Sequence, residues 1–535
     1  MNLLRKITSS KFFNLELFSF ILFIIVHIAL FNFNVAEWGD SYRILRASEF
    51  IRDGSYPLDE KRPPLFSILL SIRPFSMEAV VWGRVVMFVF SFLSFLLFYK
   101  LVEIYIKKEK YRFLTLLLFL FNPVYLYWSI RIMADVPFSF FVLLFFYLNS
   151  KWPKKDYLKI FLLGIVCGLS ILTRFEGYLL LGAGIVEVIF QREDLFKNKI
   201  KIKNILSVFL KNFGNMIPLV LATLLVIGPW LVYRNPLRSK YFDEAEKRVY
   251  DLKMIWTYFT SLIYILGFTS GISFVILKFK IAKDFLLKNI GLTAFILLEL
   301  VLILFWPAAI PRLFAPLIPF FIIVTTKCLE FYMEECNTEP KRDYRVLLAN
   351  IFFVLFYLLS QYFLKLQFLV LGYRMLAAVF LIQVTSLILL FLRKNNVYFV
   401  SIVFSSIFWS IYTINMHRYV FKTVKEASQY ASDNLVGTIA YNDISAIPDW
   451  YLNISDSKCD NSGVHMLFED NVNLKYSKLK DKKIDYLILS NEHNPDVSVG
   501  LEKRKYLQPI KEFSYNVNET VFFAKIIRFN QDYKE

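Results

Sequence analysis

The sequence has few of the residues that usually build metal centres and disulfide frameworks. Its 535 residues include four histidines and four cysteines. Cys167 lies in an apolar run, and the other three cysteines are spread out without a C-x-x-C pair. A disulfide framework and a His-rich metal site are therefore not expected. The sequence also lacks internal repeats, low-complexity segments and any zinc-knuckle or other nucleic-acid motif.

Acidic residues are also in short supply. The chain has 62 Lys and Arg residues against 44 Asp and Glu residues, which gives a net charge of +18. Such a charge can attract nucleic acid, but here the cations cluster in short loops between apolar runs. This placement is typical of loops retained in the cytoplasm. We therefore expect a lipid bilayer as a partner, and no nucleic acid.

Long apolar runs make up most of the chain. Hydrophobic residues account for 57% of it, and the runs are about 20 residues long, enough to cross a hydrocarbon core of about 30 Å. They predict a polytopic α-helical membrane protein with about 13 transmembrane helices. The predicted spans are 14–34, 79–104, 112–129, 135–150, 157–173, 177–190, 215–233, 256–276, 284–306, 310–329, 346–368, 372–392 and 397–415.

The basic loops predict how these spans are oriented. Every second loop is basic, so the N-terminus should be cytoplasmic, and an odd number of spans then puts the C-terminus outside. The first apolar run follows a basic segment and lacks an A-x-A cleavage site, which indicates an uncleaved first span in the cell membrane. Residues 35–78 would then form the first outer loop.

The composition changes after about residue 416. Residues 421–434 have the pattern of a helix, and residues 435–443, 485–490 and 520–529 look like strands rich in Val, Ile, Tyr and Phe. The sequence therefore predicts two parts. Residues 1–415 form the transmembrane module, and residues 416–535 form a small extracytoplasmic α/β domain.

The first outer loop contains a helical pattern beside an acidic residue. Apolar residues recur at helical spacing between Ser41 and Asp53, and Gly54 suits a C-cap. Asp40 stands just before this pattern. It could be the N-cap of the helix, or an ionised and fixed carboxylate that acts as a general base, and the two roles are compatible.

Later in the same loop, the sequence KRPPL, residues 61–65, leads into another apolar stretch. The two prolines fix the backbone as the chain turns back toward the membrane. Lys61 and Arg62 would then lie near the lipid headgroups. They could be snorkelling cations, or they could bind a lipid-linked phosphate, for which Arg offers a bidentate fork.

Together these features resemble a known superfamily. An acidic residue soon after the first span, a nearby Tyr, the G-x-Y-P turn at residues 54–57 and the KRPPL sequence are similar to the GT-C membrane glycosyltransferases. The closest resemblance is to the dolichyl-phosphate-mannose–protein mannosyltransferase branch, which includes the lipid A aminoarabinose transferases. The resemblance implies a similar number of spans, a catalytic acidic residue in the first outer loop and often a C-terminal outer domain.

Further outer segments match this resemblance. Asp135, the pair Arg174 and Glu176, and Arg312 each lie where a predicted span begins or ends on the outer side. Each also has a purely structural explanation. Asp135 could be an N-cap, Arg174 and Glu176 could form an interfacial ion pair, and Arg312 could be an interfacial anchor.

The resemblance implies a role for each candidate residue. Asp40 and Asp135 would be catalytic, with Asp40 as the general base, and the two could share a divalent cation such as Mg²⁺ or Mn²⁺. The donor phosphate would be bound by Lys61, Arg62, Arg174 and Arg312. The substrate-positioning candidates are Glu37, Tyr42, Tyr56 and Glu176.

The implied activity is transfer of a sugar from a polyprenyl-phosphate donor to a protein, lipid or glycan acceptor on the outer face, with inversion at the anomeric carbon. A multi-pass transporter or lipid flippase is the alternative, because it would share the many spans and the buried charges. A membrane scaffold with an outer binding domain is a third possibility. Arg84 and Glu299, inside predicted spans, would either line the donor cavity or pair structurally.

Overall fold

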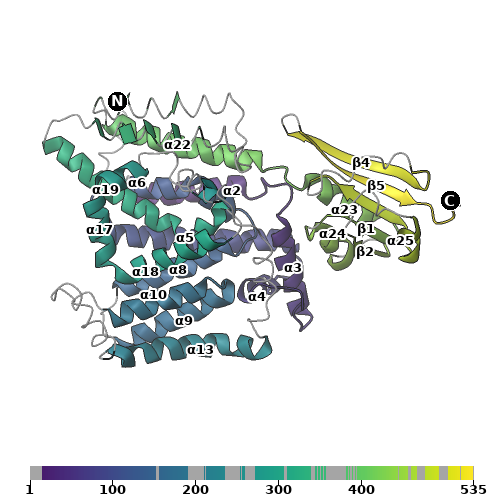
Figure 1. Cartoon of the computed structure of the whole chain (residues 1–535), viewed down its shortest axis with the longest axis horizontal. Helices are drawn as coiled ribbons and strands as arrows, with labels where there is room; N and C mark the ends of the chain where they lie inside the picture. The colour runs from purple at the N-terminus through teal and green to yellow at the C-terminus, as the bar shows by residue number, and fades with distance from the viewer. Residues whose placement is uncertain are drawn as a thin grey trace.

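A helical bundle and a small sheet make up the computed structural model (Figure 1). The structure describes residues 15–151, 156–190, 212–234, 271–306, 310–338, 395–443, 445–455, 459–466, 476–492, 504–517 and 520–533, with scattered positions between 210 and 392. Within that part of the chain, three helices are long and apolar enough to cross a membrane, or four if one bent pair counts as a span. The predicted number of about 13 spans is therefore not confirmed. Most residues of the predicted spans 256–276, 346–368 and 372–392 lie outside the described residues.

Most described helices of the bundle follow the predicted spans. They are α2 (Leu15–Leu30), α5 (Ala79–Tyr105), α8 (Asp135–Lys151), α9 (Tyr157–Thr173), α10 (Gly177–Ile189), α13 (Met216–Tyr233) and α22 (Asn395–Met416). α16 (Gly271–Leu277) covers only the end of the predicted span 256–276, and α19 (Ile318–Thr338) is displaced toward the C-terminus from the predicted span 310–329. The bounds of α9 are those predicted, because Asp156 caps its start by accepting a hydrogen bond from the Leu158 N–H at 2.9 Å.

Two predicted spans are broken into pairs of helices. In place of 112–129 the chain forms α6 (Glu109–Leu120) and α7 (Pro123–Ser129). The Asn122 side chain caps α7 by accepting hydrogen bonds from the N–H groups of Val124 at 3.2 Å and Tyr125 at 3.0 Å. Pro123 is the first residue of α7, a position that suits proline. In place of 284–306, α17 (Phe279–Lys288) and α18 (Ile290–Phe305) are bent by 108°.

Two glycines bring α9 and α13 into close contact. Gly164 and Gly168 are four positions apart, so they share one face of α9. A Cβ atom at Gly164 would overlap the Leu219 carbonyl oxygen of α13, and one at Gly168 would lie 2.5 Å from Val226 Cβ. Small residues allow this close backbone approach, which is how helices associate in lipid. The packing fixes the end of α9, where Arg174 follows.

The C-terminal part forms a five-stranded sheet. Its strands are β1 (Gly437–Tyr441), β2 (Asn461–His465), β3 (Tyr486–Ser490), β4 (Leu507–Val517) and β5 (Thr520–Phe529), in the order β2-β1-β3-β5-β4. β1 pairs in parallel with β2 and β3, and β5 pairs antiparallel with β3 and β4. The short helices around the sheet are α23 (Lys422–Asn434), α24 (Ile447–Asp449), η5 (Trp450–Ile454) and α25 (Tyr476–Asp481). The three predicted strands and the helix at 421–434 are confirmed, whereas β2 and β4 were not predicted.

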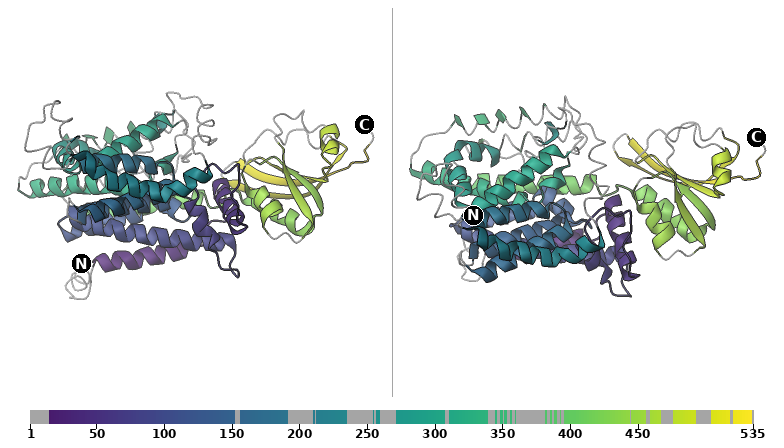
Figure 2. Two further views of the ribbon diagram at one scale, coloured as in Figure 1. Left: turned by 90° about the horizontal axis from the view of Figure 1, so that it is seen from below. Right: turned by 60° about the horizontal axis from the view of Figure 1, so that its bottom comes forward.

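The predicted first outer loop folds into α3 (Gly39–Arg52) and α4 (Leu65–Ser71). The predicted helix is confirmed, but its C-cap is Asp53 and not Gly54. Gly54 is the next residue, where it has a φ of 76° and donates its N–H to the Ile51 carbonyl at 3.0 Å. α3 stands across one end of the bundle, between the bundle and the sheet, in every view (Figures 1 and 2). This position makes α3 part of two interfaces.

Aromatic packing joins α3 to the α/β region. Tyr42 is 1% exposed, and its ring centroid lies 6.2 Å from that of Trp450 and 5.9 Å from that of Tyr451. A Cβ atom on Gly39 would lie 2.8 Å from Ser445 Cβ, so the backbone of α3 touches the loop after β1 directly. The side of α3 that faces away from the bundle is therefore packed against the α/β region.

Candidate active site

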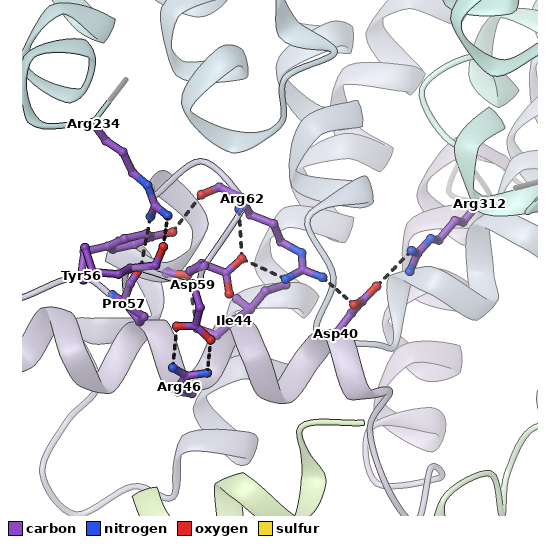
Figure 3. Close-up of polar contacts among 12 residues, drawn as sticks. Asp40, Ile44, Arg46, Tyr56, Pro57, Asp59, Arg62, Arg234 and Arg312 are labelled. Atoms are coloured by element: carbon purple, nitrogen blue, oxygen red, sulfur yellow. Dashed lines mark hydrogen bonds and ion pairs between the residues drawn. The ribbon is translucent and has the colours of Figure 1, made fainter. Parts of the chain in front are cut away.

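Asp40 lies in the first turn of α3 and not at its N-cap. The N-cap residue is Trp38, which makes no capping bond through its side chain. The Asp40 carboxylate instead accepts hydrogen bonds from Arg62 Nη2 at 2.5 Å and from Arg312 Nη2 at 3.0 Å (Figure 3). The N-cap interpretation was wrong because two guanidinium groups, which bond more strongly than neutral N–H groups, take this carboxylate.

The two arginines reach Asp40 from distant parts of the chain. Arg62 lies within the predicted first outer loop, where two prolines lead into α4. Arg312 lies in η3 (Pro311–Phe314), a 3₁₀ turn before α19, and its guanidinium carbon lies 5.3 Å from the centroid of a Trp128 ring. Arg312 is therefore aimed at Asp40 and at an aromatic face, and is not simply an anchor at the lipid interface.

These arginines determine the charge of Asp40. Burial alone would raise the pKa of its carboxyl, but the positive charges of Arg62 and Arg312 outweigh burial and hold the pKa well below its usual range. Asp40 is therefore an anion at physiological pH. A carboxylate paired in this way is a weak proton acceptor, and it would become a stronger base if another anion took its arginines.

A second cluster surrounds Arg174, in the turn between α9 and α10. Its Nη1 lies 2.7 Å from Asp135 Oδ1, and its Nε and Nη2 both contact Glu176 Oε1. The predicted pair of Arg174 and Glu176 is confirmed. Asp135 is the first residue of α8, and the helix is entered through Ala134, whose carbonyl accepts the Phe138 N–H at 2.9 Å. The N-cap interpretation of Asp135 is therefore also wrong.

Two further carboxyls lie near Arg174. Burial alone would raise the pKa of Glu176, but the charge of Arg174 overrides it and lowers the pKa. Glu299 is buried in α18, within electrostatic range of Arg174 and Glu176. Its Oε2 has no hydrogen-bond partner among the described residues, and it is not one of the residues that line the cavity.

Both clusters line one cavity with a volume of about 150 Å³. It lies between the start of α3, the KRPPL segment, the start of α8, the α9–α10 turn and η3. Seven of the ten residues predicted from the sequence line it: Asp40, Lys61, Arg62, Asp135, Arg174, Glu176 and Arg312. Apolar side chains, among them Ile44, Met133 and Trp306, complete the wall. The cavity thus brings carboxylates and cations together beside apolar surface.

The other three predicted residues lie outside the cavity. Glu37 is fully buried and forms an ion pair with Arg84 at 2.9 Å, so Arg84 pairs structurally. Tyr42 packs against the α/β region. Tyr56 donates its hydroxyl hydrogen bond to the Arg62 carbonyl at 2.9 Å. These side chains are placed to support residues of the cavity wall and its surroundings, without lining the cavity themselves.

Sequence reasoning missed Glu60 and Arg234. Glu60 Oε1 accepts hydrogen bonds from the backbone N–H and from Nη1 of Arg62, both at 3.0 Å. Arg234 follows α13 and donates to the carbonyl oxygens of Pro57 and Leu58 at 3.1 and 2.6 Å. The position of Glu60 directly before the KRPPL sequence was a usable signal. Nothing local in the sequence pairs Arg234 with a turn far upstream.

The two aspartates were expected to share a divalent cation. Across the part of the chain that the structure describes, no three His, Cys, Asp or Glu side chains come together as a metal site. Asp40 and Asp135 are each bound by guanidinium groups, whose positive charge opposes a metal ion at the same oxygens. This arrangement does not fit Mg²⁺ or Mn²⁺ well, so the metal stays a prediction and no step proposed below depends on it.

Known proteins share this architecture. The family model described as dolichyl-phosphate-mannose-protein mannosyltransferase matches residues 61–233. The crystal structure of ArnT from Cupriavidus metallidurans bound to undecaprenyl phosphate aligns over 94% of this chain and 97% of that chain, with a TM-score of 0.60 and 12% sequence identity. The chain has a GT-C fold. The resemblance drawn from the motifs of the first outer loop is confirmed, and a multi-pass membrane location follows from this fold and the apolar helices.

Two further solved structures complete the comparison. The apo structure of the same ArnT aligns over 95% of this chain and 97% of that chain, with 11% identity and a TM-score of 0.60. The Pmt1–Pmt2 complex of S. cerevisiae bound to the sugar donor aligns over 44% of this chain and 36% of that chain, with 15% identity and a TM-score of 0.33. No curated protein matches the chain by sequence. The likeness to ArnT shows the fold alone at 11–12% identity, so the chemistry has to be argued from the cavity.

Proposed function

We propose that the protein is a membrane glycosyltransferase that moves a sugar from a polyprenyl-phosphate donor to a protein, lipid or glycan acceptor. The observation that carries this proposal is the Asp40 carboxylate held between Arg62 and Arg312 on the cavity wall. Two guanidinium groups that converge on one anion suit a phosphate group. ArnT, which has the same fold, was crystallised with undecaprenyl phosphate.

The distribution of charge supports an extracytoplasmic cavity. Arg312 lies just before α19, whereas Glu334 and Glu335 near its other end pair with Lys108 and Lys278. Since α19 has 21 residues, it is about 30 Å long, so the cavity and these basic segments lie at opposite ends of the bundle. The positive-inside rule then favours a cytoplasmic location for the basic end and an outer location for the cavity.

Donor binding would prepare the base. The donor phosphate would take the guanidinium groups of Arg62 and Arg312, with Lys61 adding a third positive charge on the same wall. Asp40 would then lose the charges that keep its basicity low. The phosphate thus enters an anion site that Asp40 itself occupies in the free protein.

Transfer would then be a single displacement. Asp40 accepts the proton of the acceptor hydroxyl or amine as that oxygen or nitrogen bonds to the anomeric carbon. The bond between the anomeric carbon and the phosphate oxygen breaks at the same time, and its electron pair leaves with the polyprenyl phosphate, whose charge the two arginines stabilise. The configuration inverts because the acceptor attacks from the opposite side. Asp135, fixed by Arg174, would orient the acceptor.

Replacing Asp40 by Asn tests the proposal. The assay offers a panel of undecaprenyl phosphates that carry sugars to the protein in liposomes and measures the rate at which undecaprenyl phosphate is released. Asp40→Asn should lower this rate by about 100-fold or more, because the general base is lost. Its affinity for undecaprenyl phosphate should rise, since the carboxylate no longer competes for the arginines. Asp59→Asn is the matched control, because Asp59 lies in the same loop but pairs with Arg46.

Either of two outcomes would contradict this function. If a folded Asp40→Asn protein transferred sugar at the wild-type rate, Asp40 could not be the general base. Movement of the lipid across the bilayer without release of undecaprenyl phosphate from any member of the panel would favour a flippase instead.

A further inference from the structure

Carboxylates hold the Arg62 side chain from two sides (Figure 3). Asp40 Oδ1 accepts a hydrogen bond from Nη2 at 2.5 Å. Glu60 Oε1 accepts one from Nη1 and another from the backbone N–H of Arg62, both at 3.0 Å. One oxygen of Glu60 therefore binds both the backbone nitrogen and the guanidinium group of Arg62.

The two carboxylates differ in their access to the cavity. The Asp40 side chain is 32% exposed and lines the cavity, whereas the Glu60 side chain is 6% exposed and does not line it. An anion that enters the cavity can therefore replace Asp40 at Arg62, but it meets no surface of Glu60. The contact with Glu60 would persist when the contact with Asp40 is lost.

The backbone of Arg62 is fixed as firmly as its side chain. Tyr56 donates its hydroxyl hydrogen bond to the Arg62 carbonyl at 2.9 Å. Arg234 holds the turn that carries Tyr56 by donating to the Pro57 carbonyl at 3.1 Å, and its guanidinium carbon lies 5.5 Å from the centroid of the Tyr56 ring. The N–H of Arg62 is thus bonded by Glu60 and its carbonyl by Tyr56, which leaves the residue little freedom.

We propose that Glu60 is a positioning residue that keeps the Arg62 guanidinium in the phosphate site after the donor has displaced Asp40. This inference rests on the proposed function, because it names how one phosphate-binding residue of that site is kept in place. Glu60 touches neither the phosphate nor the reacting atoms, and it acts only through Arg62. Its value is geometric, since a fixed guanidinium loses less freedom when it binds an anion.

A simple counter-charge would behave in the opposite way. As a negative charge close to an anion site, Glu60 would weaken phosphate binding in proportion to its charge alone. As a positioning residue, Glu60 would strengthen binding through the reach of Oε1 to both nitrogen atoms of Arg62. Charge and reach can be changed separately, which makes the two models distinguishable.

The experiment compares Glu60→Asp with Glu60→Gln. The first keeps the charge but shortens the side chain, and the second keeps the length and the acceptor oxygen but removes the charge. Binding of radiolabelled undecaprenyl phosphate would be measured on the full chain in phosphatidylcholine nanodiscs. We expect Glu60→Asp to bind about 10-fold more weakly than the wild type, the size of one charged hydrogen bond, and Glu60→Gln to bind at least as tightly as the wild type.

The order of the affinities decides the question. Weaker binding by Glu60→Asp than by both the wild type and Glu60→Gln supports the proposal, and any other order overturns it. Asp59→Glu is the control, because it changes the length of the neighbouring carboxylate, which is paired with Arg46. An equal loss in Asp59→Glu would assign the effect to the whole loop and overturn the role of Glu60. If the wild type itself did not bind undecaprenyl phosphate, the proposed function would fail first, and that result is distinct from the others.

Discussion

Ion pairs lie near both ends of α19, and they differ in how far they are exposed to water. At its start, Arg312 joins Asp40 on the wall of a cavity whose other pair, Arg174 with Asp135, has a carboxylate that is only 2% exposed. At its end, Lys108 pairs with Glu334, and both side chains are about half exposed, at 51% and 42%. The Asp135 carboxylate is shielded from water and the Lys108–Glu334 pair is not, while Asp40, at 32% exposed, lies between these extremes. An ion pair alone therefore does not mark a functional site, because the energy of such a pair depends on how far it is shielded from water.

The largest loss of stability is expected when Arg174 is removed. Arg174→Gln would leave the buried Asp135 carboxylate without its guanidinium partner and would release Glu176 as well. Loss of one partner of a buried pair costs about 3–5 kcal/mol, so the free energy of unfolding of the detergent-solubilised protein should fall by that amount. Arg46→Gln is the matched control, because its partner Asp59 is 58% exposed. A loss in Arg174→Gln no greater than in Arg46→Gln would show that the cavity does not shield its charges.

A smaller effect is expected at the opposite end of the bundle. Lys108→Gln should change the free energy of unfolding by no more than about 1 kcal/mol, the usual range for exposed pairs. This difference in the free energy of unfolding should become smaller as salt is added, because exposed charges are screened. Thermal unfolding at low and high salt would measure it. A loss as large as that of Arg174→Gln would place this pair among the shielded ones.

The contribution of Asp40 to the stability of the folded protein should not change between pH 5 and pH 8. The pKa of Asp40 is held below its usual range, so its ionised form stabilises the folded state at pH values above the ordinary carboxyl pKa of about 3.9, and this contribution is lost only as the pH falls through the lower folded-state value. The difference in stability between the wild type and Asp40→Asn should therefore be constant from pH 8 to pH 5. A difference that narrows over this range would mean that the arginines do not control the carboxyl.

Local patterns in the sequence were enough to find most of the cavity. The helical spacing after Asp40 and the prolines after Arg62 are properties of neighbouring residues, and α3 forms where that spacing indicates. The GT-C resemblance supplied the other candidates, Asp135, Arg174 and Arg312. All of them line the cavity because they stand at the ends of helices that begin or end on one side of the bundle.

What the sequence could not provide were the partners across long separations. The N-cap remained one of the two possible roles of Asp40 because the competing Arg312 lies 272 positions away. Tyr42 was interpreted as a substrate contact because the aromatic residues that bury it lie in η5, in the C-terminal part of the chain. β2 was missed because its five residues, NSGVH, have no apolar alternation of their own and pair only in the folded sheet.

The position of α3 also restricts how this protein can vary among relatives. Surface loops usually tolerate substitution freely, but α3 presents Asp40 to the cavity and, two positions later, Tyr42 to the α/β region. A change in the size of Tyr42 would tilt the helix unless Tyr451 changed in compensation. Positions 42 and 451 should therefore covary in an alignment of close relatives, as residues in contact do, while position 40 stays acidic.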